Sequence, residues 1–516
     1  MSPASGAGRL DVALVHPGGR MQVYQALGRE LTAIEPPVWA GLMAAYLRKK
    51  GFSVRIVDAD AEDLTPEETA QRVQEMNPLL AAVVVYGHHP SASTQTMPAA
   101  GAICAAIKQR TPQQKTVLVG GHAAALPERT LREEEADFVA GGEGPVTLWD
   151  LLQALRSDRP ENLSQVRGLW YWEGATVRSN PPAPLVKNLD EEMEGVAWDL
   201  LPMGKYRAHN WHCFGDLKRQ PYASMYTTLG CPYHCAFCCI QAPFKAGEKL
   251  QGLKDSVNTY RYWSPDAVIR QIDLLVGRYG VRNIKFADEM FVLNPTHILG
   301  ICDRIIERGY RLNIWAYARV DTVKEGMLEK LKEAGFNWLA FGIESANERV
   351  RADAEKGFAQ ELISKTIRRV QEAGIHIGAN YIFGLPEDDG QTMQETLDLA
   401  LELNAEWANF YCAMAYPGSQ LYNTALREGW LLPEAWSGYS QHSVDALPLP
   451  TKHLAASQVL RFRDEAFQIY FTHPRYLGMI ERKFGIETAQ HIRQMASHRL
   501  IRRRVTDSDP AVVARG

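Results

Sequence analysis

The sequence has no apolar run long enough to cross a membrane. Its longest stretch without Asp, Glu, Lys or Arg, residues 76–107, is interrupted by two histidines, a proline and several hydroxyl residues, whereas a membrane span needs about 20 mostly apolar residues. Residues 1–10 are small and polar and lack the apolar core of about 7–15 residues that a secretion signal requires. We therefore expect a cytoplasmic protein without a membrane span.

Positive charge is not in excess either. The 56 Lys and Arg residues face 60 Asp and Glu, for a formal net charge of −4, and broad nucleic-acid binding usually needs a basic surface. We expect no nucleic-acid partner. With 46% hydrophobic and 22% charged residues over a length of 516, the chain is typical of a globular protein of two to four domains.

Cysteine is scarce outside one short segment. Four of the eight cysteines lie within positions 231–239, and the others are scattered at Cys104, Cys213, Cys302 and Cys412. In a reducing compartment, clustered cysteines are more often metal ligands than disulfide partners. The cluster is therefore a candidate metal site.

The first 150 residues alternate short β-branched runs with helical patterns. The predicted strands are Val12–Val15, Val54–Val57, Ala82–Tyr86, Thr116–Val119 and Phe138–Ala140. The predicted helices are Val38–Lys50, Pro66–Met76, Met97–Arg110 and Val146–Leu155. This alternation predicts a doubly wound, Rossmann-like α/β domain, with ligands bound at the carboxyl ends of its strands. A G-x-G-x-x-G fingerprint is absent, so a dinucleotide has little support.

A second alternation follows a mixed segment with a predicted hairpin at Gly168–Val177. Its predicted strands are Tyr226–Leu229, Asn283–Phe286, Asn313–Ala318, Trp338–Ile343, His376–Ile382 and Ala408–Ala413. Six β/α units predict a partial (β/α)6 barrel rather than the full eight-stranded form, followed by a helical region. The expected domains are 1–160 for the α/β domain, 161–220 for a linker, 221–429 for the barrel and 430–516 for the helical C-terminal domain.

Three cysteines follow the first predicted barrel strand with the spacing C-x3-C-x2-C. Thiolates of Cys231, Cys235 and Cys238 can hold three irons of a cubane and leave the fourth iron open to a chelating ligand. The alternatives are a zinc site, which usually takes four ligands in two C-x2-C pairs, and a chance grouping of buried cysteines. No second pair is present, and we therefore expect a 4Fe-4S cluster.

This loop, with the aromatic Phe237 just before its last cysteine, resembles the signature of the radical S-adenosylmethionine (radical SAM) superfamily. The resemblance implies that the open iron binds S-adenosylmethionine and that its one-electron cleavage yields a 5′-deoxyadenosyl radical. A reductant such as flavodoxin or ferredoxin is implied as the electron donor.

The same resemblance implies S-adenosylmethionine contacts at the ends of later strands. Asp288 and Glu289 stand where the family often has Gly-Gly-Glu against the methionine amino group, and Arg319 suits the methionine carboxylate. Glu344 suits the ribose hydroxyls, and Gly384 the adenine side. Ordinary ion pairs are the alternative for each charged residue.

The order of domains is similar to that of cobalamin-binding radical enzymes related to the anaerobic magnesium-protoporphyrin IX monomethyl ester cyclase. Matching segments are Glu35-Pro36-Pro37, Gly120-Gly121-His122 and Gly141-Gly142-Glu143-Gly144. The resemblance implies cobalamin contacts from Ser91, Ser93, Thr94, Gly120, Gly121, His122, Gly142 and Glu143.

One feature of other cobalamin proteins is missing. The D-x-H-x-x-G motif, which supplies a histidine to cobalt, does not occur in the sequence. The lower cobalt ligand is then either a non-histidine group or one of His16, His88 and His122.

The function that the resemblance implies is a cobalamin-dependent methyltransferase. It would act on an unactivated carbon of a small-molecule substrate, through a 5′-deoxyadenosyl radical and methylcobalamin. The alternative is a radical cyclase or oxidase that uses cobalamin without methyl transfer. Methylthio transfer has less support because only Cys104 lies in the N-terminal domain, and a non-enzymatic cobalamin sensor would have no use for an open cluster. Aromatic residues near Trp211 and Trp436 either cap the barrel or pack in its core.

Overall fold

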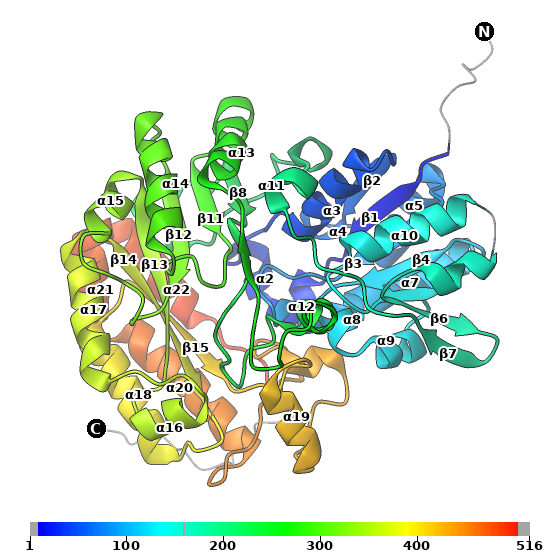
Figure 1. Cartoon of the computed structure of the whole chain (residues 1–516). Coiled ribbons are helices and arrows are strands. Elements are labelled where there is room, and N and C mark those ends of the chain that lie inside the picture. Colours follow the sequence, from blue (N-terminus) through cyan, green and yellow to red (C-terminus); the bar gives the residue numbers. More distant parts are fainter. Residues whose placement is uncertain (1–8, 158–159, 504–516) are drawn as a thin grey trace. The chain divides into compact units, whose positions relative to one another are not determined.

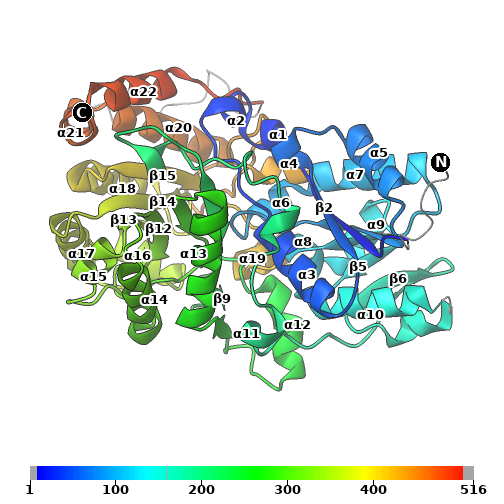
Figure 2. The ribbon, with the colours of Figure 1, turned by 90° about the horizontal axis from the view of Figure 1, so that it is seen from above.

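The computed structural model describes residues 9–157 and 160–503 (Figures 1 and 2). The chain folds as two compact units. The first holds residues 1–19, 37–202 and 241–257, and the second holds residues 20–36, 203–240 and 258–516. The outermost parts of the expected terminal domains, residues 1–8 and 504–516, and residues 158–159 lie outside the described residues.

This division differs from the limits expected from the sequence in two places. Residues 20–36, from the predicted α/β domain, belong to the second unit, and residues 241–257, from the predicted barrel, belong to the first. The chain therefore passes between the units more often than a linear order of domains implies. The limits at 160, 220 and 429 stay predictions.

A seven-stranded sheet forms the centre of the first unit, in the order β2-β1-β3-β4-β5-β6-β7. Five parallel strands are β1 (Val12–His16), β2 (Val54–Asp58), β3 (Leu80–Val84), β4 (Thr116–Val119) and β5 (Phe138–Ala140). Every residue of β3 and β4 is buried, as expected of aliphatic strands covered on both faces. The order 2-1-3-4-5 is that of a doubly wound fold with its switch point between β1 and β3, which confirms the predicted class.

Helices cover this sheet, with α3 packed beside α10 and α5 packed beside α7 (Figure 1). The helices of the unit are α3 (Val38–Lys49), α4 (Ala59–Glu62), α5 (Pro66–Met76), α6 (Ala92–Gln95), α7 (Met97–Arg110), α8 (Gly121–Ala125), α9 (Pro127–Glu133), α10 (Pro145–Arg156), α11 (Leu189–Glu192) and α12 (Ala242–Leu250). The predicted hairpin is present as β6 (Leu169–Glu173) and β7 (Thr176–Ser179), and it extends the sheet antiparallel from β5.

A six-stranded parallel sheet forms the centre of the second unit, in the order β15-β14-β13-β12-β11-β8. Its strands are β8 (Tyr222–Met225), β11 (Asn283–Phe286), β12 (Asn313–Ala318), β13 (Phe336–Glu344), β14 (His376–Phe383) and β15 (Trp407–Cys412). An open sheet of six such units is the predicted partial barrel, and this part of the prediction is confirmed.

The predicted position of the first barrel strand, Tyr226–Leu229, was wrong. The strand is β8, which ends at Met225, because the next residues are drawn out of the sheet. The backbone N–H and the hydroxyl of Thr227 both donate to Asp288 Oδ1 at 2.9 Å. Residues Thr228–Gly230 then form β9, which pairs antiparallel with β10 (Tyr260–Tyr262). The cysteine loop therefore begins at the end of a separate two-stranded ladder.

Helices lie around the outside of the second sheet (Figure 2). They are α13 (Pro265–Tyr279), α14 (Pro295–Glu307), α15 (Leu328–Glu333), α16 (Glu348–Asp353), α17 (Gln360–Glu372), α18 (Gly390–Leu403) and α19 (Gln420–Arg427), and two short helices, α1 (Arg20–Tyr24) and α2 (Leu27–Glu30), precede them in the chain. The Ser264 hydroxyl accepts from the Ala267 N–H to cap α13, and Gly280, with φ +64°, ends it. Glycine is favoured there because a Cβ disfavours this left-handed conformation.

Aromatic side chains close the amino ends of the barrel strands. The Trp211 ring lies 5.1 Å from that of Trp315 on β12 and 5.2 Å from that of Trp338 on β13. Phe214 adds edge contacts to Trp338 and Trp407. The segment around Trp211 thus both caps the barrel and belongs to its core.

The C-terminal helices are α20 (Ala456–Thr472), α21 (Pro474–Phe484) and α22 (Ile486–Ser497). The helical region starts later than expected, because residues 430–455 contain only a short 3-10 turn at Trp436–Tyr439. Helix α21 is tied to the barrel through Glu406, whose fully buried carboxylate receives Lys483 and the Ile377 N–H. No helix within the described residues is long and apolar enough to span a membrane.

Replacing Glu406 with glutamine should destabilise the second unit in a pH-dependent way. Burial alone would raise the pKa of this carboxyl, but His376, Lys483 and the Ile377 N–H lower it to about 2. The folded chain therefore keeps Glu406 ionised to a lower pH than the unfolded chain does. Its stabilising effect is present above the ordinary pKa of 4.5 and is lost as the pH falls through about 2.

We expect the variant to lose about 2–3 kcal/mol of unfolding free energy at pH 7 and about half of that at pH 3. Urea unfolding followed by circular dichroism measures the difference. The matched control is Glu402→Gln, whose exposed carboxylate pairs with Arg368 and should contribute little. A loss that is the same at both pH values would contradict the assignment.

Candidate functional site

The cysteine loop is fixed by backbone hydrogen bonds to the end of helix α16 and the first turn of helix α19. Gly230, with φ +86°, ends β9 and turns the chain into the loop. Within the loop the Cys238 N–H donates to the Cys235 carbonyl at 2.9 Å. The Ala236 N–H donates to the Ala354 carbonyl at 3.0 Å, and the Ala236 carbonyl accepts from the Leu421 N–H at 2.8 Å. The segments after β13 and β15 therefore hold the loop in place.

The thiols of this loop interact with one another. Burial raises the pKa of Cys231 to about 12 and that of Cys238 well above its usual value; Cys235 adds to the rise at Cys231, and Cys239, Cys235 and Cys231 add to the rise at Cys238. Arg319 Nη1 donates toward Cys235 Sγ at 3.8 Å. One buried and two partly buried thiols, with a guanidinium at Cys235, fit a metal cluster, because iron would displace their protons and stabilise the thiolates.

The arrangement differs from that of a single-ion site. Among the described residues, no three Cys, His, Asp or Glu side chains converge on one ion. A cubane does not require such convergence, because each thiolate binds a different iron.

The two carboxylates after β11 have different surroundings. Asp288 is fully buried, and its Oδ1 holds Thr227 at the start of the cysteine segment. Glu289 is half-buried. Burial raises the pKa of Glu289 to about 8, which Lys285 lowers and Asp288 raises, and its charge acts on Cys231 and Cys238. Glu289 therefore interacts electrostatically with the thiols, whereas Asp288 holds Thr227 at the start of their segment.

Arg319 already has a carboxylate partner. Its Nε and Nη2 donate to the two oxygens of Asp321 at 3.0 and 3.1 Å, and its guanidinium lies 3.9 Å from the centre of the Tyr233 ring. This bidentate pair fixes the guanidinium plane. Nη1 is thereby directed at the cysteine loop.

Glu344 is paired with a lysine that the sequence analysis missed. Glu344 ends β13 with φ +65°, beside a shift in strand register, and its carboxylate receives Lys356 Nζ. Both side chains are under one-tenth exposed. Lys356 Nζ also lies 5.9 Å from the centre of the Phe237 ring. No motif marks Lys356, because only the return of the chain after α16 brings it beside Glu344.

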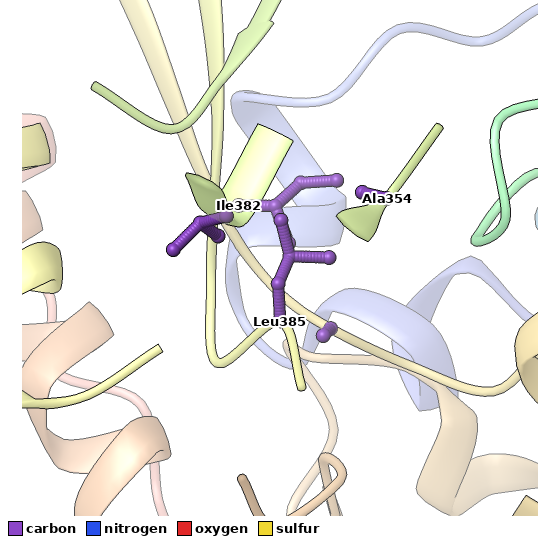
Figure 3. Packing of buried hydrophobic residues seen from close by; sticks show 5 residues of the cluster. Ala354, Ile382 and Leu385 are labelled. Carbon is purple, nitrogen blue, oxygen red and sulfur yellow. The ribbon is translucent and has the colours of Figure 1, made fainter. Parts of the chain in front are cut away.

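Phe237 packs against an apolar cluster of five buried residues (Figure 3). The cluster consists of Val350, Ala354, Ile382, Leu385 and Ala413. Figure 3 shows Ile382 at the end of β14 and Leu385 in the turn that follows it, with Ala354 from the end of α16 nearby. Gly384, with φ +80°, begins the turn that carries Leu385, and Asp388 Oδ2 accepts both of their backbone N–H groups at 3.0 Å. The cluster therefore supports the partly buried ring of Phe237 from behind.

In the first unit, the loops after β3 and β4 are joined through Ser93. Its buried hydroxyl donates to the Val85 carbonyl and accepts from the His122 N–H at 2.8 Å. A Cβ on Gly120 would lie 2.3 Å from the Val85 oxygen, so the two loops approach too closely for any other residue there. Gly121 would only reach ordinary contact distance, 3.4 Å, from Ser93 Oγ.

The predicted histidines have separate surroundings. His122 is 2% exposed, and its Nδ1 lies 3.1 Å from Thr94 Oγ1. Burial lowers the pKa of His122 to about 3, with a contribution from Arg129, so the ring is neutral at pH 7. His16 ends β1 at the switch point of the sheet. His88 stacks edge-on against His89, which accepts or donates at Ser91 Oγ.

In the glycine-rich loop after β5, Gly142 is loosely packed and Glu143 is held by hydrogen bonds. A Cβ on Gly142 would meet nothing nearer than the Pro243 carbonyl at 3.9 Å. Glu143 is buried and its Oε2 accepts from the Val186 N–H at 3.0 Å, while its carbonyl accepts from Tyr86. The position of Gly142 is thus not closely packed, and Glu143 holds the loop.

Replacing Ser93 with alanine should destabilise the first unit by about 1–3 kcal/mol, because it leaves a buried carbonyl and a buried N–H unpaired. Thermal unfolding of the apoprotein measures this loss. Ser91→Ala is the control, since Ser91 is half-buried and pairs only with His89. Equal stability of the two variants would argue against the role of Ser93 in joining the loops.

Comparison with known proteins matches two parts of the chain to families. Residues 225–400 match the radical SAM superfamily and residues 24–152 match the B12 binding domain. An uncharacterised methyltransferase of Pyrococcus horikoshii is 29% identical over 453 residues, which cover 88% of this chain and 91% of that protein.

Two further proteins are similar over most of the chain. The anaerobic magnesium-protoporphyrin IX monomethyl ester cyclase of Cereibacter sphaeroides is 25% identical over 420 residues, covering 80% of this chain and 63% of that protein. The solved structure of OxsB, a cobalamin-dependent S-adenosylmethionine radical enzyme, matches with a TM-score of 0.66 and 17% identity. That match covers 94% of this chain and 72% of the other. The fold, with both domains in this order, is therefore shared.

Proposed function

Because this chain belongs to the radical SAM enzymes that carry a B12-binding domain, we propose that it is a cobalamin-dependent methyltransferase acting on an unactivated carbon. The observation that carries the proposal is the presence, in one chain, of a three-thiol loop and a B12-binding domain. Similarity over nearly the whole length to a protein named as a methyltransferase favours methyl transfer.

Its cofactors are a 4Fe-4S cluster, S-adenosylmethionine and cobalamin. When bound, they supply reductive cleavage of S-adenosylmethionine and carriage of a methyl group, while the protein positions and shields them. A reductant such as flavodoxin or ferredoxin is required, and the substrate is a small molecule. The reducing conditions that suit free cysteines favour a cytoplasmic location.

We assign the cluster to Cys231, Cys235 and Cys238. Their loop is held by the end of α16 and the first turn of α19, and Cys235 interacts electrostatically with both other thiols. Cys239 lies outside the spacing and has no assigned role.

For S-adenosylmethionine we assign Glu289 to the methionine ammonium and Arg319 Nη1 to its carboxylate. Asp288 acts through Thr227 and is a positioning residue. Glu344, fixed by Lys356, accepts from the ribose hydroxyls. We assign Phe237 and the turn at Gly384 to the adenine, and the apolar cluster supports the Phe237 ring.

For cobalamin we assign the loops after β3, β4 and β5. Ser93, Gly120 and Glu143 shape these loops through buried hydrogen bonds and close backbone approach. The residues that remain for contact with the corrin or its nucleotide tail are Ser91, Thr94, Gly121, His122 and Gly142.

The test of the proposal is product mass analysis with methyl-labelled S-adenosylmethionine and a pool of small metabolites. We expect one metabolite to gain a labelled methyl group, and the gain to disappear in the variant lacking all three cluster cysteines. Consumption of a metabolite with 5′-deoxyadenosine formation but without label would instead support a radical cyclase or oxidase, which the similarity to the cyclase also favours.

A further inference from the structure

The inner face of the six-stranded sheet carries polar side chains that the cofactor assignments do not use. Tyr411 on β15 is 36% exposed, although its neighbours Phe410 and Cys412 are 1% and 5% exposed. Tyr317 on β12 is half-buried between two buried alanines. Since side chains alternate across a strand, the buried neighbours face the outer helices and both tyrosines face the inside. This inner face is therefore not filled by protein at these positions.

Two asparagines on the same face are held in a directed hydrogen-bond chain. Trp407 Nε1 donates to Asn409 Oδ1 at 2.9 Å, and Asn409 Nδ2 donates to Asn380 Oδ1 at 2.9 Å. Asn380 Nδ2 in turn donates to the Phe341 carbonyl at 3.0 Å. The indole nitrogen can only donate, so it fixes the orientation of both amides. Each asparagine amide has one N–H and one acceptor site that these hydrogen bonds do not use.

The two tyrosines add hydroxyl groups that are likewise available for hydrogen bonds to a ligand. Tyr317 and Tyr411 have no hydrogen-bond partner for their hydroxyls among residues 9–157 and 160–503. Burial raises the pKa of Tyr411 to about 12, with Glu344 contributing, and burial together with Tyr411 raises the pKa of Tyr317 well above its usual value. Both phenols stay neutral and able to donate at pH 7. Tyr317 on β12 and Tyr411 on β15 both stand at the less buried, inward-facing positions of their strands.

Positive charge near this face is already neutralised. Each of three cations on or after its strands has a carboxylate partner: Lys285 with Glu35, Arg319 with Asp321, and Lys356 with Glu344. Glu35 also accepts a hydrogen bond from the Tyr222 hydroxyl at 2.7 Å, so its carboxylate is held in place beside Lys285. An anionic substrate group would lose its hydration on this face and would have to compete for a counter-charge with these carboxylates and, at Arg319, with the methionine carboxylate as well, which is costly.

We propose that the inner face formed by Tyr317, Asn380, Asn409 and Tyr411 binds the substrate, and that the substrate is an uncharged planar molecule with an amide or lactam-type group. Such a group offers the paired donor and acceptor that each oriented asparagine matches, and its plane suits contact with the tyrosine rings. The face lies between the aromatic floor at Trp211 and the carboxyl ends of the strands, where barrel enzymes carry their chemistry. The inference rests on the proposed function for the identity of the bound molecule as substrate.

Nicotinamide and nicotinate form a matched pair of probes, because they share one ring and differ by an amide against a carboxylate. Binding to the cofactor-loaded protein is measured by saturation-transfer NMR and calorimetry. We expect nicotinamide to bind in the millimolar range, as a fragment should, and nicotinate to bind at least about tenfold more weakly. Asn380→Leu should weaken nicotinamide by about tenfold or more, and Tyr411→Phe by about threefold to tenfold.

Tyr262→Phe is the control, since this tyrosine on β10 is 51% exposed and lies outside the six-stranded sheet. Tyr411→Phe removes a single hydroxyl and keeps the proposal testable if Asn380→Leu does not fold. Nicotinate binding as tight as nicotinamide, or nicotinamide binding unchanged in both variants, would overturn the proposal. The binding measurement needs no turnover and therefore tests this inference separately from the methyltransferase proposal. Methyl transfer to a substrate with a charged group on its reacting ring would overturn this inference and leave the methyltransferase proposal standing.

Discussion

Replacing Cys231, Cys235 and Cys238 together with alanine is expected to reduce bound iron and sulfide from about four of each per chain to near zero. Formation of 5′-deoxyadenosine should fall by more than about 100-fold, because no open iron remains to bind and reduce S-adenosylmethionine. Anaerobic reconstitution followed by iron and sulfide analysis, visible absorbance and chromatography of the nucleoside measures both effects.

Two comparisons make this result specific. Cys239→Ala should keep its iron, since Cys239 is adjacent to the motif and outside its spacing. The triple variant should still bind hydroxocobalamin, because the assigned cobalamin loops belong to the first unit and the cysteines to the second. Undiminished iron and sulfide in the triple variant would remove the cluster assignment.

Turnover with the true substrate is expected to consume two molecules of S-adenosylmethionine. One is cleaved to 5′-deoxyadenosine, and the other donates its methyl group and leaves as S-adenosylhomocysteine. The two products should accumulate in a ratio of about one to one after correction for cleavage without substrate. Liquid chromatography with mass detection measures both in one sample.

The two products depend on different parts of the chain. The triple cysteine variant should make no 5′-deoxyadenosine, whereas S-adenosylhomocysteine from methylation of reduced cobalamin does not require radical cleavage. If 5′-deoxyadenosine accompanies product while S-adenosylhomocysteine and methyl label are absent, the methyltransferase proposal fails. A radical cyclase or oxidase would then be the better description.

The sequence predicted helix limits well where caps and prolines within the same segment set them. Helices α5 and α7 begin and end where the sequence placed them, because a Thr65 capping box starts one and a proline near the first turn starts the other. The first barrel strand was misplaced because residues 222–230 contain two strand-like pieces. The choice between them depends on Asp288, which is far away in the sequence and binds Thr227.

Charged site residues were predicted by position, and their partners were not. Glu344 and Arg319 stand at strand ends that the pattern identifies, whereas Lys356 and Asp321 gained their roles from the way the loops return. Glu35 illustrates the same limit. It was noted as part of a segment similar to cobalamin enzymes, yet its carboxylate lies in the second unit against Lys285 and Tyr222.

By itself, the sequence determined the two kinds of α/β domain, the three clustered thiols and the loops rich in small residues. Strand periodicity, helix caps and ligand spacing are short-range properties, which a chain displays before it folds. Only the tertiary structure decided which carboxylate reaches the thiols, which cations are already neutralised and which polar side chains line the inner face of the barrel sheet. Those properties depend on burial and on pairs of residues distant in sequence, and folding alone brings such pairs together.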